Sequence, residues 1–445
     1  MLSHGYPPTI SGVTLIVQKF SRMLVRNGFR VRIITGSEQG NHYHDLDDGV
    51  ELVRLRSYSN PVWREAPIPY ITAPRLEYLI KEFSPSLIHT HENMILSTQL
   101  LKLRPSIQVP FLSSAYSLPE FLSSYVNVGK FIENLAKSII WKHLIINMNQ
   151  YDRVVFSNPT LKEFYLKKGL LQPSSIISNG VDTIRYHPGE DRRREITQKY
   201  SLPPNPRIIH VSRLARDKQI EVIIKAMPEI HSRCNAHLQV IGRGEHRTHL
   251  EQLIQHLDNA HCVHMLGFVA EDDLPSIYRC ADLFVAAGRC ETQSLPALQA
   301  LATGLPVVLA DAACLPELVQ HGENGYLVPP GDPTKLSEAV INILVNHQKS
   351  VRYGKASLRL VEDHAQSVSL QKLITLYLEL KERTQLTMHL YNSLGQLVQS
   401  LYNAQVPAGE TTLQFSGMDM LQSGTYLLRM RSSDGGVKTL SMIKP

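Results

Sequence analysis

Residues 207–244 are RIIHVSRLARDKQIEVIIKAMPEIHSRCNAHLQVIGRG, and this stretch decides the predicted fold. The apolar run Arg207–Val211 predicts a buried strand, helical spacing of apolar residues predicts a helix at Ile220–Met227, and His237–Ile241 predicts a second strand. Two strands joined by a crossover helix form a βαβ unit, in which the strands lie parallel in one sheet. We therefore expect a doubly wound α/β domain around this stretch.

The same alternation of strands and helices extends to both sides. Further strands are expected at Phe29–Thr35, Leu87–His89, Pro110–Leu112, Val154–Phe156, Ser175–Ile177, Val263–Met265, Leu283–Ala286, Pro306–Ala310 and Tyr326–Val328. A chain of 445 residues exceeds one ordinary core, so we predict two successive Rossmann-like domains that face a ligand cleft. Met1–Pro8 has the pattern of a strand's tail entering a loop, and we expect the first strand to be truncated.

Changes in composition mark the expected boundaries. Tyr186–Pro206, rich in proline and arginine, predicts a linker, and residues 386–445 alternate in the manner of short strands. Turns are expected there at Asn392-Ser393, Pro407–Gly409, Ser423-Gly424 and Asp434–Gly436. We predict an N-terminal acceptor domain at 1–187, a C-terminal donor domain at 188–367, a helix crossing back at 368–384 and a small all-β sandwich at 385–445.

The formal charge of +6 is unevenly distributed. Residues 1–188 hold 20 Lys and Arg residues against 14 Asp and Glu residues, so they carry the whole surplus. This surplus suits an anionic membrane surface or a phosphorylated acceptor, and a mildly basic solvated surface is the alternative. We expect no nucleic-acid partner, because no Arg/Lys tract is interleaved with aromatic residues.

Five cysteines without a C-x-x-C pair predict free thiols in a reducing compartment. The sequence has no run of about 18 apolar residues that predicts a membrane span, and no signal peptide is evident at its start. We therefore expect a cytoplasmic protein, or one that is peripheral on the inner membrane face.

Two cations and a carboxylate are the candidate catalytic residues. Arg213 and Lys218 follow the strand Arg207–Val211, where they can clamp a diphosphate, and a solvated basic loop is the alternative. Glu291 precedes a predicted helix, where it can accept hydrogen bonds from sugar hydroxyls or simply cap the helix. Gln299 follows two turns later, within reach of ribose hydroxyls.

Other residue patterns leave alternatives open. Gly242 and Gly244 permit close approach of backbone to a ligand, or form a simple turn, and Gly12 is similar. His89 and His91 are a possible metal pair without a third ligand, so a structural pair is preferred. A stretch containing Trp141, Lys130, Lys137 and Lys142 predicts either membrane contact or core packing.

An ordered set of short motifs resembles the retaining glycosyltransferase family 4, also called glycosyl transferases group 1, over about residues 4–384. The motifs are Pro7–Val13, His89–His91, Ser178–Asp182, Val211–Leu214 with Lys218, Val240–Gly244, Leu266–Val269, Ala281–Val285, Glu291–Leu295, Ala302–Val308 and Gly325–Asp332. The resemblance implies a GT-B fold, a nucleotide-diphosphate sugar as donor, retention at the anomeric carbon and no required metal or other cofactor.

The resemblance also implies roles for individual residues. It places Arg213 and Lys218 on the diphosphate and Glu291 on the donor sugar, as catalytic residues. The donor-binding residues that it implies are Gly12, Gly242, Gly244, Phe268, Val269, Gln293, Ser294, Leu295 and Gln299. The chain departs from the family at Gln299, which replaces a second glutamate, and at Tyr116, which stands where a histidine is expected. We assign Tyr116 and His91 to the acceptor side.

The C-terminal module resembles the type IX secretion sorting domain of Bacteroidetes-like bacteria. The resemblance rests on Leu390–Val398, Gly409-Glu410 and Leu421–Arg429. It implies export as an alternative localisation.

The predicted function is transfer of a hexose from a UDP- or GDP-linked sugar to a lipid or glycan acceptor. The alternative is a catalytically weak carbohydrate-binding or cell-surface protein, which the residues Gln299 and Tyr116 favour.

Overall fold

The computed structural model describes most of the chain. It covers residues 1–9, 11–60, 67–91, 93, 95–116, 118–121, 129–189, 192–204, 206–381, 384–406, 421–432 and 437–444. The chain forms two compact units, Met1–Lys372 and Leu373–Pro445, which are described separately below.

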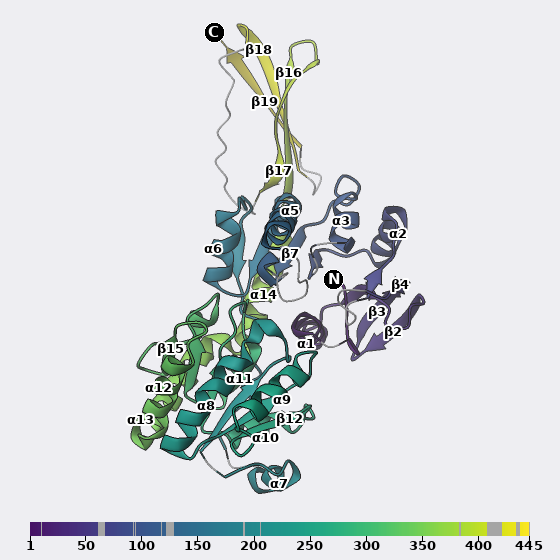
Figure 1. Cartoon of the computed structure of the whole chain (residues 1–445). Helices are drawn as coiled ribbons and strands as arrows, with labels where there is room; N and C mark the ends of the chain where they lie inside the picture. The colour runs from purple at the N-terminus through teal and green to yellow at the C-terminus, as the bar shows by residue number, and fades with distance from the viewer. Residues whose placement is uncertain are drawn as a thin grey trace. The chain divides into compact units, whose positions relative to one another are not determined.

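The N-terminal half of the first unit is built on two parallel-rich sheets (Figure 1). The strand orders are β1-β3-β2 and β6-β7-β8-β9. Leu2 forms parallel bridges to Ile34 and to Thr90, so Leu2 joins the two sheets. The strands of this half are β1 (Arg32–Gly36), β2 (Tyr43–Asp47), β3 (Val50–Leu55), β4 (Ser57–Tyr58), β5 (Ile68–Pro69), β6 (Ile88–Thr90), β7 (Phe111–Ala115), β8 (Arg153–Phe156) and β9 (Ser174–Ile176).

Helices connect these strands as the alternation predicts. They are α1 (Gly12–Arg26), α2 (Ala73–Phe83), α3 (Ile95–Leu101), α5 (Lys130–Met148) and α6 (Pro159–Lys167), with a short 3-10 helix at Pro119–Phe121. Ser11 is the N-cap residue of α1, because its hydroxyl accepts a hydrogen bond from the Thr14 backbone N–H. Trp141 of α5 is buried against Tyr165, and this outcome confirms the core-packing alternative for Trp141.

The second half of the unit holds a six-stranded parallel sheet in the order β12-β11-β10-β13-β14-β15. This is the doubly wound order, in which the strand sequence reverses between the first and fourth strands. The strands are β10 (Arg207–Val211), β11 (His237–Ile241), β12 (Val263–Gly267), β13 (Leu283–Ala286), β14 (Val307–Ala310) and β15 (Gly325–Val328). Together the two halves confirm the predicted GT-B architecture.

Helices cover both faces of this sheet (Figure 1). Successive strand residues point to opposite faces, so Ile209 and Phe284 pack in one core cluster while Ile208 and Val285 pack in the other. The helices are α7 (Arg193–Lys199), α8 (Ile220–Cys234), α9 (Arg247–His256), α10 (Leu274–Arg279), α11 (Leu295–Ala302), α12 (Pro333–Leu344) and α13 (His347–Val361). The next helix, α14 (Gln366–Lys381), spans the boundary between the two units. Short 3-10 helices lie at Arg216–Lys218, Leu315–Leu318 and Glu362–His364.

The segment Tyr186–Pro206 is more ordered than the linker predicted from its sequence. It contains α7, and Ile196 and Leu202 are buried in the core of the six-stranded half. The prolines and arginines suggested a loop. The apolar residues between them instead pack this segment against the core of the six-stranded half.

The second unit contains an antiparallel sheet with the strand order β17-β16-β18-β19. The strands are β16 (Thr384–Asn392), β17 (Leu397–Val406), β18 (Gly424–Ser432) and β19 (Val437–Lys444). The all-β character is as predicted, and the described residues form this single sheet. The predicted turns at Pro407–Gly409 and Asp434–Gly436 and the matching residues Gly409-Glu410 lie outside the described residues.

A search of the helices in the described ranges found none that combines the length and the apolar character needed to cross a bilayer.

Candidate functional site

The six-stranded sheet brings two loops together at its switch point. β10 and β13 are neighbours, and both run in the same direction, so the loops that follow them leave the same edge of the sheet. In doubly wound sheets this position, outside the carboxyl ends of the strands, is where ligands bind. The first loop carries Arg213 and Lys218, and the second carries Glu291.

A charged cluster occupies this position. Nζ of Lys218 lies 2.6 Å from Oε1 of Glu291 and 3.0 Å from Oδ2 of Asp217. The guanidinium of Arg213 lies 3.8 Å from Oδ1 of the same aspartate. Two cations and two carboxylates therefore balance within the cluster.

Lys218 is held in its charged form. Burial lowers the pKa of its ammonium, but the carboxylates of Glu291 and Asp217 outweigh the burial, and the pKa is raised above its ordinary value. An ammonium has three N–H donors. One of them donates to Oε1 of Glu291, and Asp217 lies within ion-pair distance of the same nitrogen. One donor remains for a ligand.

Two glycines allow the loop that carries Arg213 to sit where it does. A Cβ atom at Gly242 would lie 1.8 Å from the carbonyl oxygen of Ser212, and one at Gly244 would lie 2.2 Å from that of Leu214. The Leu214 N–H also donates a hydrogen bond over 2.8 Å to the carbonyl of Arg243, which lies in the loop after β11. These glycines therefore support the loop after β10 by close backbone contact.

Helix α11 begins at the end of the second loop. The hydroxyl of Ser294 caps it by accepting a hydrogen bond from the Ala297 N–H over 3.3 Å, and Leu295 is the first helical residue. Further along the helix, the side-chain oxygen of Gln299 accepts a hydrogen bond from the buried hydroxyl of Tyr278 over 3.1 Å. Gln299 thus has a structural partner within its own domain.

Gln293 connects the second loop with the N-terminal half. Its side-chain amide donates to the carbonyl of Ser157 over 3.3 Å and to the hydroxyl of Ser178 over 3.1 Å. Its side-chain oxygen accepts from the Asn179 N–H over 2.8 Å. Gln293 is 8% exposed, so both amide hydrogens are used in this buried link rather than in solvent. Sequence analysis assigned Gln293 to the donor and did not anticipate this role.

Of the residues predicted near the base and phosphates, Phe268 and Gly12 are exposed and Val269 is buried. Phe268 follows β12, is exposed, and has the Arg243 guanidinium 4.9 Å above its ring, while Val269 is buried. Gly12 is the first residue of α1, and a Cβ atom placed there would meet no protein atom within 4 Å. Space beside Gly12 is therefore open.

The residues assigned to the acceptor side form an aromatic pair, in which His91 is buried and Tyr116 is half-buried. Nδ1 of His91 lies 3.0 Å from the hydroxyl of Tyr116, and the two rings stack with centroids 5.8 Å apart. Burial lowers the pKa of His91 to about 3 and raises that of Tyr116 to about 12, so both groups are neutral near pH 7. The ring of His89 lies 4.0 Å from that of His91, as expected for a structural pair.

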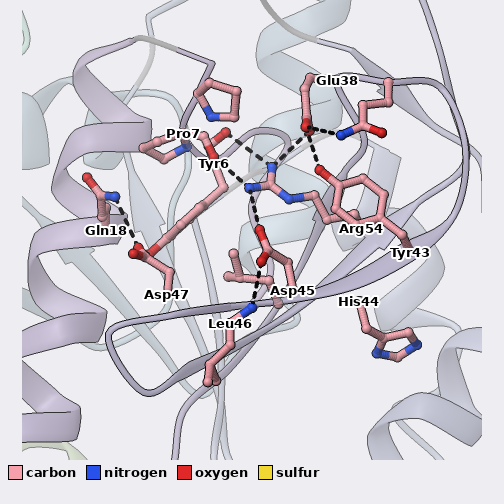
Figure 2. Close-up of a pocket in the computed structure, with 13 residues that line it drawn as sticks. Tyr6, Pro7, Gln18, Glu38, Tyr43, His44, Asp45, Leu46, Asp47 and Arg54 are labelled. Carbon is pink, nitrogen blue, oxygen red and sulfur yellow. Dashed lines mark hydrogen bonds and ion pairs between the residues drawn. The ribbon is translucent and has the colours of Figure 1, made fainter.

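A separate pocket of about 440 Å³ lies in the N-terminal half (Figure 2). Arg54 is buried at its centre and lies 3.1 Å from Oε2 of Glu38 and 3.8 Å from Oδ2 of Asp45. The hydroxyl of Tyr6 donates to Asp47 over 2.7 Å along one wall. Carboxylates and aromatic rings together suit a hydroxyl-rich ligand. Sequence analysis missed this pocket, because its residues come from the first loop, α1, the loop after β1, β2 and β3.

Asp217 is the other residue that sequence analysis missed. Its side chain is 1% exposed and lies beside both cations of the cluster. A signal was present in the sequence, since Asp217 directly precedes Lys218, but only the tertiary fold shows that it faces the site.

Two family models match the chain. The one described as Glycosyltransferase Family 4 matches residues 10–185, and the one described as Glycosyl transferases group 1 matches residues 205–346.

Curated relatives match over different extents. An uncharacterized glycosyltransferase of Methanocaldococcus jannaschii is 28% identical over 382 residues, which are 80% of this chain and 94% of that protein. A GDP-mannose-dependent alpha-(1-6)-phosphatidylinositol monomannoside mannosyltransferase of Mycobacterium tuberculosis is 31% identical over 185 residues, 40% of this chain and 48% of that protein. The structure of Anabaena HepE in complex with UDP-glucose matches with a TM-score of 0.68 at 18% identity, over 85% of this chain and 98% of that chain.

Proposed function

Since the chain is a glycosyltransferase with the GT-B fold of the group 1 and family 4 proteins, we propose that it transfers a hexose from a UDP- or GDP-linked sugar to a lipid acceptor, with retention and without a metal. The observation that carries the proposal is the cluster of Arg213, Lys218, Asp217 and Glu291 at the switch point of the six-stranded sheet. Support for the donor class comes from the UDP-glucose bound by the HepE protein and from the GDP-mannose used by the mannosyltransferase.

The cations of the cluster are proposed to contact the diphosphate, and Glu291 is proposed to contact the sugar. Negative charge develops on the diphosphate as its bond to the anomeric carbon breaks, and cations fixed in advance stabilise that charge. Lys218 has one N–H to give to this group, and Arg213 supplies a second cation from the same loop. Lys218 approaches Oε1 of Glu291 most closely, so we assign the other carboxylate oxygen, Oε2, to the sugar hydroxyls.

The proposal that no metal is needed rests on the resemblance to family 4 and on two side-chain cations. A nucleotide diphosphate brings at least two negative charges to the site. Arg213 and Lys218 are the cations that the cluster offers to these charges, and Asp217 and Glu291 pair with the same two cations. Glu291, one of the two carboxylates that keep Lys218 charged, is also the residue that we place against the sugar.

The lipid acceptor is supported by one face of α5. Phe131, Leu135, Ile139 and Ile146 are all more than half exposed, and their spacing places them along one side of the helix. Lys142 is exposed on the same helix. An apolar row with adjacent cations is the pattern that lies in the headgroup region of an anionic membrane. We propose that α5 holds the enzyme on the inner membrane face.

The C-terminal sheet takes no part in this proposal for catalysis. Its residues lie outside the unit that holds the charged cluster. The resemblance of the module to a sorting domain keeps export as the alternative localisation.

The experiment that tests the proposed function is transfer to a lipid acceptor in vesicles. The full chain is incubated with UDP-glucose or GDP-mannose, diacylglycerol-containing anionic vesicles and a chelator, and the anomeric coupling in the product is read by NMR. We expect an α-linked product, formed faster on anionic than on neutral vesicles. An inverted product, or strict dependence on added Mg²⁺, would overturn the proposal.

A further inference from the structure

Histidine and cysteine side chains gather at the edge of the six-stranded sheet where β11 and β12 begin. His231 lies in the last turn of α8, and His237 is the first residue of β11. His261 and Cys262 directly precede β12, which carries His264. We call these five residues the His–Cys cluster. Sequence analysis gave none of them a role.

The side chains of the cluster are in mutual contact. The ring centroids of His231 and His261 lie 4.8 Å apart, and His237 lies 5.3 Å from His231 and from His264. One ring nitrogen each of His231 and His261 and the Sγ atom of Cys262 all lie within 4.8 Å of one another. Three donor atoms of the type that binds a metal therefore lie close together.

Backbone carbonyls fix two of the imidazoles in the form that a metal requires. Nδ1 of His231 lies 3.0 Å from the carbonyl oxygen of Ala236, and Nδ1 of His261 lies 2.9 Å from that of Asp258. A carbonyl oxygen only accepts hydrogen bonds, so each Nδ1 carries the proton and each Nε2 keeps its lone pair. Hydrogen bonds of this kind orient the ligating histidines of most protein metal sites.

From this geometry we propose that His231, His261 and Cys262 bind a divalent ion of the Zn²⁺ class, with His237 or water as the fourth ligand. Two imidazoles and a thiolate match the ligands that Zn²⁺ prefers, whereas Mg²⁺ and Ca²⁺ prefer oxygen. Bonds of about 2.1 Å place tetrahedral ligands about 3.4 Å apart. The three donor atoms must therefore approach one another by up to about 1.4 Å. The two imidazoles can supply this movement, because His261 is exposed and His231 is half-buried, whereas Cys262 is buried. Binding replaces the thiol proton of Cys262 with the metal and releases that proton to water.

The proposed metal has no part in sugar transfer. The His–Cys cluster lies where β11 and β12 begin, whereas the charged cluster lies beyond the ends of β10 and β13. In a parallel sheet these are opposite edges, and a five-residue strand spans about 17 Å. The ion would tie the end of α8 to the segment that leads into β12, and would stabilise the donor half.

The test is metal binding by the full chain after treatment with a chelator. Zn²⁺ is titrated by calorimetry, and Co²⁺ is used as a spectroscopic probe for a thiolate ligand. We expect one ion per chain, a sulfur-to-cobalt charge-transfer band in the near ultraviolet, and loss of that band in the Cys262→Ser variant. The double variant His231→Gln/His261→Gln should weaken Zn²⁺ binding at least 100-fold.

The chain offers a matched control in a second group of possible ligands, Glu221, His246 and His249. The double variant His246→Gln/His249→Gln removes the same number of imidazoles and should leave the affinity unchanged. Binding that survives loss of His231 and His261, binding that depends on His246 and His249, or no stoichiometric binding would each overturn the proposal. If the double variant of the cluster does not fold, His261→Gln alone decides the question, because His261 is exposed.

Discussion

Nζ of Lys218 lies 2.6 Å from Oε1 of Glu291, although 73 positions separate the two residues in the chain. The contact exists because β10 and β13 are neighbours in the sheet and the loops after them meet at one edge. This pair links the residue proposed for the diphosphate to the residue proposed for the sugar. Substitutions of the two residues should therefore have distinguishable effects on donor binding and on kcat.

Glu291→Ala should lower kcat roughly 100-fold or more, which is the usual loss when a group acting in the transition state is removed. Gln299→Ala should mainly raise KM for the donor, because ribose contacts are similar in the ground and transition states. Steady-state kinetics at saturating acceptor distinguish the two variants. Similar losses of kcat in both would refute this division of roles.

Gln293→Ala should destabilise the protein by about 2 kcal/mol, because it leaves the buried Asn179 N–H and Ser157 carbonyl without their partner. It should also lower kcat, since Gln293 anchors the loop that carries Glu291 to the N-terminal half. Urea unfolding and kinetics measure the two effects. Gln320→Ala is the matched control, because Gln320 is exposed, and it should change neither. An equally stable, fully active Gln293→Ala variant would show that the link is unimportant.

A chain stopped at Arg383 should keep its kcat/KM within about tenfold of the full chain. Every residue proposed to contact the donor lies in the compact unit Met1–Lys372, and the deleted strands β16–β19 belong to the other unit. A small antiparallel sheet can fold around contacts of its own, so its loss should affect solubility more than chemistry. A larger fall in kcat/KM, with the melting of the remainder unchanged, would place the module in the active site.

Stability should fall as the pH drops below about 6.5. Burial lowers the pKa of His91 to about 3 and that of His210 to about 4, so below 6.5 the unfolded chain binds protons that the folded chain does not. Each of these two histidines then lowers the free energy of unfolding by about 1.4 kcal/mol per pH unit, until the pH reaches the pKa of that histidine in the folded chain. Urea unfolding at pH 7.0 and pH 5.0 measures this slope, and His91→Gln or His210→Gln should reduce it. Equal slopes in the wild type and both variants would argue against buried neutral histidines.

Much of the fold was predictable because it depends on local apolar runs. The strands Arg207–Val211, His237–Ile241 and Leu283–Ala286 were predicted with the bounds that the structure has, since each is buried on both faces. Strand β2 was missed, because most of Tyr43–Asp47 is exposed at a sheet edge and lacks an apolar pattern. Strand β3, Val50–Leu55, was also missed, although it is buried and mostly apolar. Hydrophobic periodicity reports burial, and it gives no signal where a strand is solvated.

The candidate site was predictable only in part, for a different reason. Arg213, Lys218 and Glu291 follow strands whose order in the sheet brings them together. The link through Gln293 joins residues more than 110 positions apart, and no local pattern encodes such a contact.

The most direct test of the account is calorimetric titration of UDP and GDP into the full chain in the presence of a chelator. We predict that at least one of them binds with the same Kd with and without Mg²⁺. Arg213→Met and Lys218→Met should each weaken that binding at least tenfold, or about 1.4 kcal/mol. Binding that requires Mg²⁺, or that neither variant weakens, would contradict the claim that these two cations hold the donor diphosphate.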